Sequence, residues 1–167
     1  MLTQDEAVDI LEAGYNKIGA LLEGLPPERL TEPGIGGDGW SAQDLIGHVA
    51  FWERAALEAL DAWSDGGAAP IDRALARGIT VVNRDALRRI RERSLEEVRA
   101  DAERVHFNLL LSIQEMGPDL WESLPTARHI NSLGESLGRI LTGPDGPFTH
   151  AAAHIPDLEA FVKGTSS

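Results

Sequence analysis

The stretch FTHAAAHIPDLEAF, residues 148–161, holds two of the chain's five histidines four positions apart. In an α-helix, residues i and i+4 lie on one face with Cβ atoms about 5–6 Å apart. His150 and His154 could therefore bind one metal ion together, or they could be two polar residues on a solvated surface. The HxxxH spacing arises often by chance, so a third ligand elsewhere in the chain decides between these interpretations.

His48 is the candidate third ligand, because it falls within the apolar stripe of another predicted helix. Leu45 precedes it by three positions and Trp52 follows it by four. A buried imidazole needs a partner, since an unsatisfied buried polar group costs about 1–3 kcal/mol. A bond to a backbone carbonyl is the commoner solution for a lone core histidine. Three imidazoles from two adjacent helices of a bundle would instead make an open coordination sphere for zinc or nickel.

Other side chains are weaker candidates for a functional role. Trp52, one helical turn from the candidate ligand, is the best candidate for a pocket wall, and His106, at the boundary of an apolar stripe, is a second one. His129 is interpreted as a loop residue. Glu53 and Asp157 could orient the metal ligands, although surface exposure is the commoner interpretation for each.

Several chemistries are excluded by what the sequence lacks. It has no cysteine, which removes disulfides, thiolate nucleophiles and cysteine-based zinc sites. It has no G-x-S-x-G nucleophile elbow. The glycine-rich run GIGGDG precedes a predicted helix but follows no strand, so it does not indicate a dinucleotide-binding loop.

The elements that must position the histidines are helices. Apolar residues at spacings of three and four, with capping boxes at three of the starts, predict helices over 3–25, 41–63, 70–93 (interrupted at Gly78), 94–116 and 148–162. No alternating strand pattern and no internal repeat are present. We expect an all-α fold, a four-helix bundle with extra short helices in the crossovers, forming one domain over residues 1–167.

Charge and hydropathy constrain the partners. A net charge of -12 opposes binding to DNA phosphates, so we expect no nucleic-acid partner. No stretch approaches the ~18 consecutive apolar residues of a membrane span, and the start MLTQDEAVDIL lacks the basic region of a signal peptide. We therefore expect a cytoplasmic protein with a small-molecule substrate and no membrane partner. Bundles of this type often pair, so we also expect a homodimer.

Three widely separated motifs resemble one family. The first, GWSAQDLIGHVAFWE at 39–53, resembles the second helix of the DinB-like metalloprotein superfamily. The other two resemble the ClbS/DfsB-type branch of that superfamily: residues 83–106 resemble its middle segment, and residues 148–161 resemble its closing helix. The resemblance covers almost the whole chain, with the motifs in the expected order. Residues 128–147 have no counterpart in it.

The resemblance implies a DinB-like four-helix bundle that holds a divalent metal through three histidines, which carry over to His48, His150 and His154. The superfamily includes mycothiol-dependent maleylpyruvate isomerases and bacillithiol or mycothiol transferases, which adds a low-molecular-weight thiol as an expected cofactor. The favoured function is a metal-dependent enzyme, either a thiol-cofactor transferase or a hydrolase acting on a small molecule. The alternatives are a metal-containing protein that binds a small molecule in stress protection without turnover, and a helical interaction module with structural histidines.

Overall fold

The computed structural model describes residues 2–164, which form helices joined by loops and contain no β-strand. The helices are α1 (Gln4–Glu23), α2 (Ala42–Ser64), α3 (Pro70–Leu75), α4 (Ile79–Arg91), α5 (Leu95–Glu115), α6 (Pro118–Glu122), α7 (Leu133–Ile140) and α8 (Ile155–Lys163), with short 3₁₀ helices at Pro27–Thr31 and Ala152–His154. None of the described helices combines the length and the apolar character that crossing a lipid bilayer requires. The predicted all-α fold is confirmed.

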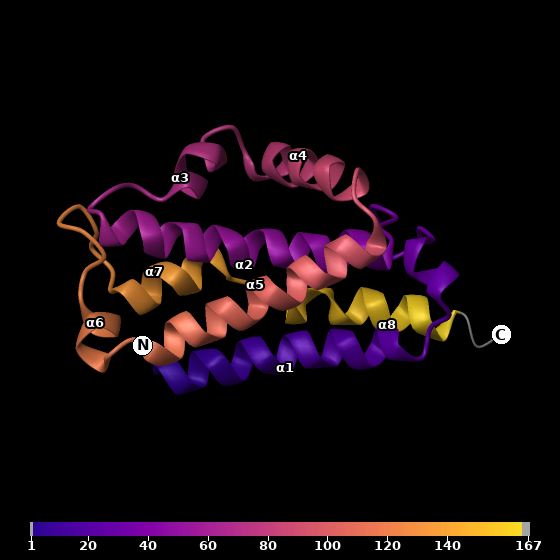
Figure 1. Cartoon of the computed structure of the whole chain (residues 1–167), viewed down its shortest axis with the longest axis horizontal. Helices are drawn as coiled ribbons and strands as arrows, with labels where there is room; N and C mark the ends of the chain where they lie inside the picture. The colour runs from indigo at the N-terminus through magenta and orange to yellow at the C-terminus, as the bar shows by residue number, and fades with distance from the viewer. Residues whose placement is uncertain (1, 165–167) are drawn as a thin grey trace.

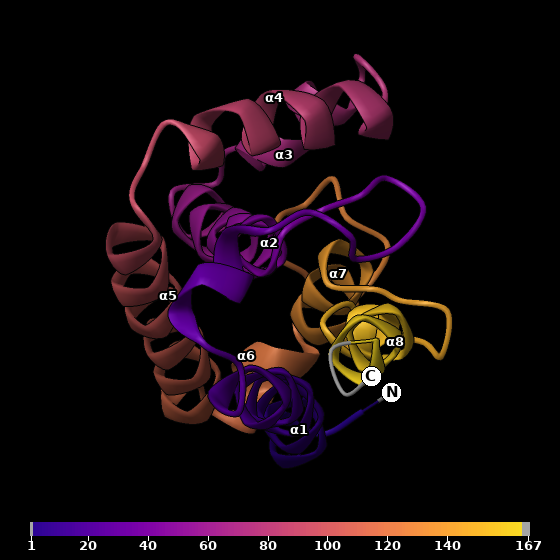
Figure 2. The same ribbon diagram turned by 90° about the vertical axis from the view of Figure 1, so that its right-hand side faces the viewer.

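The bundle has four sides. The long helices α1, α2 and α5 form three of them, and α7 and α8 follow one another along the fourth (Figure 1). Helix α2 is central, because it contacts α5, α4, α3 and α7, while α8 packs on α1. Helices α3 and α4 are the extra short helices of the crossover from α2 to α5, and they lie outside α2, away from α1 and α8 (Figure 2).

Capping boxes start the long helices where the sequence predicted them. The hydroxyls of Thr3, Ser41 and Ser94 each accept the backbone N–H three residues on, and the acidic side chain there accepts the N–H of the cap residue. Each box satisfies two N–H groups that the helix itself leaves without partners. A fourth box, at Ser132 and Glu135, starts α7 in a segment for which the sequence analysis gave no element.

The C-terminal segment differs from the continuous helix that we predicted over 148–162. Phe148 has a positive φ of 65°, and the 3₁₀ helix Ala152–His154 comes before α8. Pro156 explains the break, because it has no N–H to donate to the carbonyl four residues earlier. The N–H of Ile155 bonds that carbonyl, of Ala152, instead. His150 and His154 therefore lie before α8 and not on one regular α-helix.

The buried apolar side chains form two separate clusters along the bundle. Leu11, Trp52 and Leu109 belong to the first, and Leu45 and Leu158 belong to the second. Polar and aromatic side chains lie near the boundary between the two clusters, on α1, α2, α5 and the segment before α8. We refer to these side chains as the polar layer: Tyr15, His48, Glu53, His106, His150 and His154.

Candidate metal centre

His48 is positioned by the first turns of α2. The capping box of Ser41 and Asp44 fixes where the helix begins. Arg91 of α4 donates two hydrogen bonds, of 3.0 and 2.9 Å, to the Asp44 carboxylate, which ties that turn to the neighbouring helix. The His48 side chain is only 4% exposed, and Trp40 packs on it with ring centroids 4.6 Å apart.

His150 and His154 come from the segment that joins α7 to α8. The backbone N–H of His150 donates to the carbonyl of Leu141 at 3.1 Å, which anchors the segment to the end of α7. The segment also approaches α1 closely at Gly14, where an added Cβ would lie 3.2 Å from the Cβ of Ala151. Glycine at this position of α1 permits the approach that brings both histidines into the bundle.

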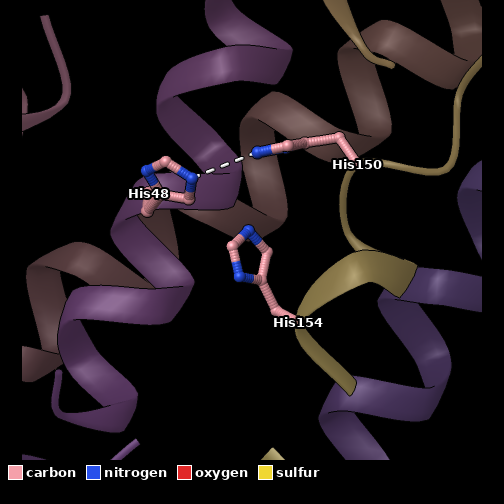
Figure 3. A group of neighbouring side chains, drawn as sticks. All are labelled: His48, His150 and His154. Atoms are coloured by element: carbon pink, nitrogen blue, oxygen red, sulfur yellow. Dashed lines mark hydrogen bonds between the residues drawn. The ribbon is translucent and has the colours of Figure 1, made fainter. Parts of the chain in front are cut away.

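The three imidazoles converge on one point (Figure 3). One ring nitrogen from each of His48, His150 and His154 lies within 4.8 Å of the others. The Nε2 atoms of His48 and His150 are 3.1 Å apart, and the three ring centroids are separated by 4.9, 5.0 and 5.2 Å. The structure thus brings together the three candidate ligands from segments that are far apart in the chain.

This set of donors fits a divalent ion. Two imidazole nitrogens that bind one tetrahedral zinc at about 2.0–2.1 Å lie about 3.3 Å from each other, close to the 3.1 Å between the Nε2 atoms of His48 and His150. The buried Nδ1 of His150 and Nε2 of His154 have no hydrogen-bond partner among residues 2–164. Buried nitrogens without partners are costly, and coordination of an ion would satisfy the Nε2 of His154, whereas the unpartnered Nδ1 of His150 is not the nitrogen that faces His48.

Burial keeps these imidazoles uncharged at neutral pH. Burial first, and then the neighbouring imidazoles, lowers the pKa of His48 to about 2 and that of His150 to about 3. Burial also lowers the pKa of His154, against a smaller opposing effect of Asp157. A neutral imidazole presents a lone pair to a metal. The set can therefore accept a cation without first releasing protons.

A cavity of about 400 Å³ opens beside His150. Trp52 and Trp63 of α2 form part of its wall, so Trp52 lies where the sequence analysis placed a pocket wall. The Trp52 Nε1–H donates to Asn83 Oδ1 of α4 at 3.2 Å, which fixes the plane of the indole. The Trp52 and His150 ring centroids are 5.9 Å apart, so the indole lies beside a candidate ligand, and both residues line the cavity.

Three residues that sequence analysis did not assign to a site also line this cavity. They are His129, Ser136 and Arg139. His129 lies edge-on to Trp63 with centroids 5.3 Å apart, and its Nδ1 is 2.8 Å from the hydroxyl of Thr126. His129 is in a loop, as predicted. No motif or periodicity in the sequence indicated that it lines the cavity, because the loop reaches the cavity only through tertiary packing.

His106 pairs with Glu53 instead of joining the three histidines. Its Nδ1 lies 2.9 Å from Glu53 Oε1, and both side chains are buried. A carboxylate oxygen only accepts, so the imidazole N–H donates. Tyr15 stacks on the ring with centroids 3.9 Å apart. Glu53 therefore orients His106, while Asp157, the other residue considered for orienting ligands, is exposed on α8.

Known proteins resemble this chain in sequence family and in fold. Residues 11–157 match the family described as the mycothiol maleylpyruvate isomerase N-terminal domain, and no curated protein matches the sequence. An uncharacterised protein from Escherichia coli UTI89 has a crystal structure with a TM-score of 0.80 at 16% identity, covering 99% of this chain and 96% of that one. The colibactin self-resistance protein ClbS, solved in complex with a dsDNA, has a TM-score of 0.71 at 15% identity, covering 100% and 98%. At these identities the two likenesses show the fold.

The ClbS structure corrects one expectation. We excluded a nucleic-acid partner from the net charge, and this was wrong, because a protein with this fold was solved in complex with a dsDNA. The physical reason is that net charge describes the whole chain, whereas binding to phosphates needs only a local basic face. Seven of the chain's 15 Lys and Arg residues lie within 73–93, a range that holds only two acidic residues, Asp85 and Glu92.

Proposed function

The chain belongs to the mycothiol maleylpyruvate isomerase N-terminal domain family, within the DinB-like superfamily, and from this premise we propose that it is a metal-dependent enzyme acting on a small molecule. The observation that carries the proposal is the convergence of three imidazoles, of which His48 is buried and His150 and His154 are half-buried, each with a lowered pKa. His48 and His150 come from segments 102 positions apart, and their Nε2 atoms are at a distance that suits two ligands of one ion.

His48, His150 and His154 would hold the ion. Imidazole nitrogen suits both zinc and nickel, and a site with three protein ligands keeps a coordination position open. An ion bound there would supply Lewis acidity, which lowers the pKa of a coordinated water or thiol toward neutrality. The chain's own contribution is to hold three neutral donors together and to exclude bulk water with Trp40, which packs on His48 and His154.

The substrate would bind in the cavity beside His150. Its volume of about 400 Å³ falls within the range of about 300–1,000 Å³ that small-molecule sites occupy. Trp52 and Trp63 offer apolar faces to the substrate, and Asn83 and Arg139 add polar groups at the rim. A small molecule in this cavity would lie directly against a candidate ligand of the metal.

Thiol transfer and hydrolysis are the two reactions that we consider for this site. The family description names mycothiol, a thiol cofactor. The chain has no cysteine, so a thiol that reacts here would have to arrive as a small molecule. The superfamily resemblance of the sequence motifs implies these two reactions, so the other reactant would be a small electrophile or a hydrolysable compound.

Turnover assays with metal-loaded protein test this proposal. We expect either consumption of an electrophile that requires an added low-molecular-weight thiol, or hydrolysis without a thiol. Both activities should disappear in His48→Ala and remain in His129→Ala with a changed KM. Stoichiometric metal without turnover in either assay would favour the binding protein without catalysis.

Binding of double-stranded DNA is a second candidate function, and the charge distribution favours it. Arg84 and Arg88 are exposed on α4, which lies on the outside of the bundle (Figure 2). The arginine-rich range 73–93 gives this side a positive charge within a negative chain. A structural neighbour, ClbS, was solved in complex with a dsDNA.

Fluorescence anisotropy with a labelled duplex tests the second candidate. We expect an affinity that falls with added salt, because phosphate contacts release counterions. An Arg84→Gln, Arg88→Gln variant should bind several-fold more weakly, whereas a control with the same loss of charge on other helices, Lys17→Gln, Lys163→Gln, should not. No binding at low salt would reject the candidate.

Three further expectations stay predictions. The range 1–167 as one domain and a cytoplasmic location follow from the sequence alone. Association of two copies has a possible contact region on α5, where Phe107 and Leu111, one turn apart, are 63% and 38% exposed. Light scattering at micromolar concentration tests the association against the monomer mass of 18.1 kDa.

A further inference from the structure

A second cavity, of about 490 Å³, lies among α2, α3, α4 and α5. It shares no lining residue with the cavity beside His150. Phe51 and Arg54 of α2 line it, whereas Trp52, between them in sequence, lines the other cavity. Helix α2 therefore separates two cavities, and the second has no part in the proposed metal chemistry.

The interior of the second cavity is apolar. Phe51 and Ile71 line it together with Ala74, Ala86 and Ile90, which come from α3 and α4. Three of these five side chains are buried and the other two are half-buried. An apolar chain or ring in this space would be removed from water, which stabilises binding by about 25 cal/mol for each Å² of apolar surface.

The rim of this cavity carries excess positive charge. Asp101 accepts hydrogen bonds from Arg54 at 2.6 Å and from Arg93 at 3.0 Å, and a third one from Arg104. One carboxylate thus serves three guanidinium groups, each of which has five N–H donors. Arg54 and Arg93, which line the cavity, therefore share this carboxylate with Arg104 and keep several unused donors.

Arg89 adds a further positive charge at the same rim. It lines the cavity, and within residues 2–164 it has no ion pair or hydrogen bond. Glu58 also lines the cavity but is exposed on α2. The arginines Arg54, Arg89 and Arg93 therefore outnumber the carboxylates around this opening.

We propose that this cavity binds a small amphipathic anion with a carboxylate head and an apolar tail. The head would accept from Arg89 and from the unused N–H groups of Arg54 and Arg93, since guanidinium pairs well with carboxylate. The tail would lie along Phe51 and Ile90. The volume of about 490 Å³ suits a small molecule and excludes a folded partner.

Calorimetry with decanoate below its micellar concentration tests the proposal, with decyltrimethylammonium as a cation of the same chain length. We expect decanoate to bind and the cation to bind at least about tenfold more weakly, since one charged hydrogen bond is worth about that factor. Binding of the two at equal strength, or no binding of decanoate, would overturn the proposal. Binding only to anionic lipid vesicles, with none to free decanoate, would overturn it as well.

Two arginines on α4 give a matched pair of variants. Arg89→Gln removes a cavity residue without breaking any ion pair that the structure records, and it should weaken decanoate binding about five- to tenfold. Arg88→Gln removes an exposed neighbour that does not line the cavity and should leave binding unchanged. Equal effects of the two substitutions would show attraction by general charge and would overturn the site.

A third variant tests the position of the tail. Ala74→Phe fills the space from α3 and should abolish decanoate binding while metal content stays at that of the wild type. His48→Ala should leave decanoate binding unchanged, so the experiment distinguishes failure of the metal proposal from failure of the proposed anion site. Unchanged decanoate binding in a folded Ala74→Phe protein would place the ligand elsewhere.

Discussion

The Nε2 atoms of His48 and His150 lie 3.1 Å apart, although 102 positions of sequence separate the two residues. His48 comes from the second turn of α2 and His150 from the segment before α8. Packing between segments far apart in the chain therefore makes this contact, and neither segment could make it alone. A site assembled in this way depends on both segments, so substitutions in either segment should disturb metal binding.

Removal of any one of the three histidines should remove the metal. His48→Ala, His150→Ala and His154→Ala each leave two protein donors, too few for an open site of the usual kind. Elemental analysis should give about one divalent ion per wild-type chain and a small fraction of this in each variant. His129→Ala should keep the ion, because His129 lies in the neighbouring cavity outside the three-histidine set. Tight binding of one ion by His48→Ala would show that the other two histidines use a different partner.

Metal should also stabilise the fold. An ion that binds only the folded state adds about 4 kcal/mol to the free energy of unfolding when free metal is a thousandfold above its Kd. Thermal melting of chelator-treated wild type with and without zinc checks this. His154→Ala should melt at the same temperature in both conditions, and a zinc-dependent shift in that variant would contradict the proposed site.

The metal-free protein should lose stability as pH falls below about 6.5. The pKa of His48 is about 2 and that of His150 about 3 in the folded state, against 6.5 for a free side chain. Below pH 6.5 the unfolded chain binds protons that the folded protein excludes, so the free energy of unfolding falls by about 1.4 kcal/mol per histidine for each pH unit. Urea titrations of chelator-treated protein at pH 7.5, 6.5 and 5.5 measure this slope. It should be shallower in His48→Leu, and an unchanged slope in that variant would contradict the prediction.

Glu53→Ala should destabilise the protein and leave its metal content unchanged. The substitution leaves the buried His106 without the carboxylate that accepts its N–H, and loss of one partner in such a pair costs about 2–4 kcal/mol. Urea denaturation measures the loss. Glu58→Ala, on the exposed side of the same helix, is the control with little expected effect. Loss of metal from a folded Glu53→Ala protein would instead assign Glu53 to the metal site.

Gly14→Val should weaken metal binding about tenfold or more, although α1 carries no candidate ligand. Its side chain would meet Ala151 and displace the segment that carries His150. Gly19→Val is the matched control, because nothing lies within 4 Å of a Cβ at Gly19 and the cost of valine in a helix is the same. Zinc titration of both variants checks the difference. Equal affinities would mean that the segment does not depend on this contact.

The sequence predicted the long helices because their signals are local. Capping boxes at Thr3, Ser41 and Ser94 mark helix starts by residue type alone. The same signal was present at Ser132 and Glu135, where α7 begins, but two glycines in the next turns lowered the expected helix propensity. The structure accounts for both, since a Cβ at Gly134 would lie 2.3 Å from the Trp121 ring and a Cβ at Gly138 would lie 2.8 Å from the Cβ of Pro147.

The candidate site was predictable in its residues and less so in its geometry. The i,i+4 spacing indicated that His150 and His154 lie on one side of the chain, and they do, with ring centroids 5.2 Å apart. The continuous helix predicted over 148–162 was wrong, because Pro156 lies in the first turn of α8 and a 3₁₀ helix at Ala152–His154 precedes it. The partner of His106 could not be predicted, since pairing with Glu53 depends on how α2 packs against α5.

The division of the core by the polar layer has a consequence for how the protein unfolds. The two apolar clusters have no side chain in common, and we expect the two halves to separate first at the polar layer. An ion held by His48, His150 and His154 would clamp α2 to the segment before α8 across this layer. We expect metal loading to set the cooperativity of unfolding. The loaded protein would melt as one unit, while the metal-free protein would open first at α8 and become open to proteolysis there.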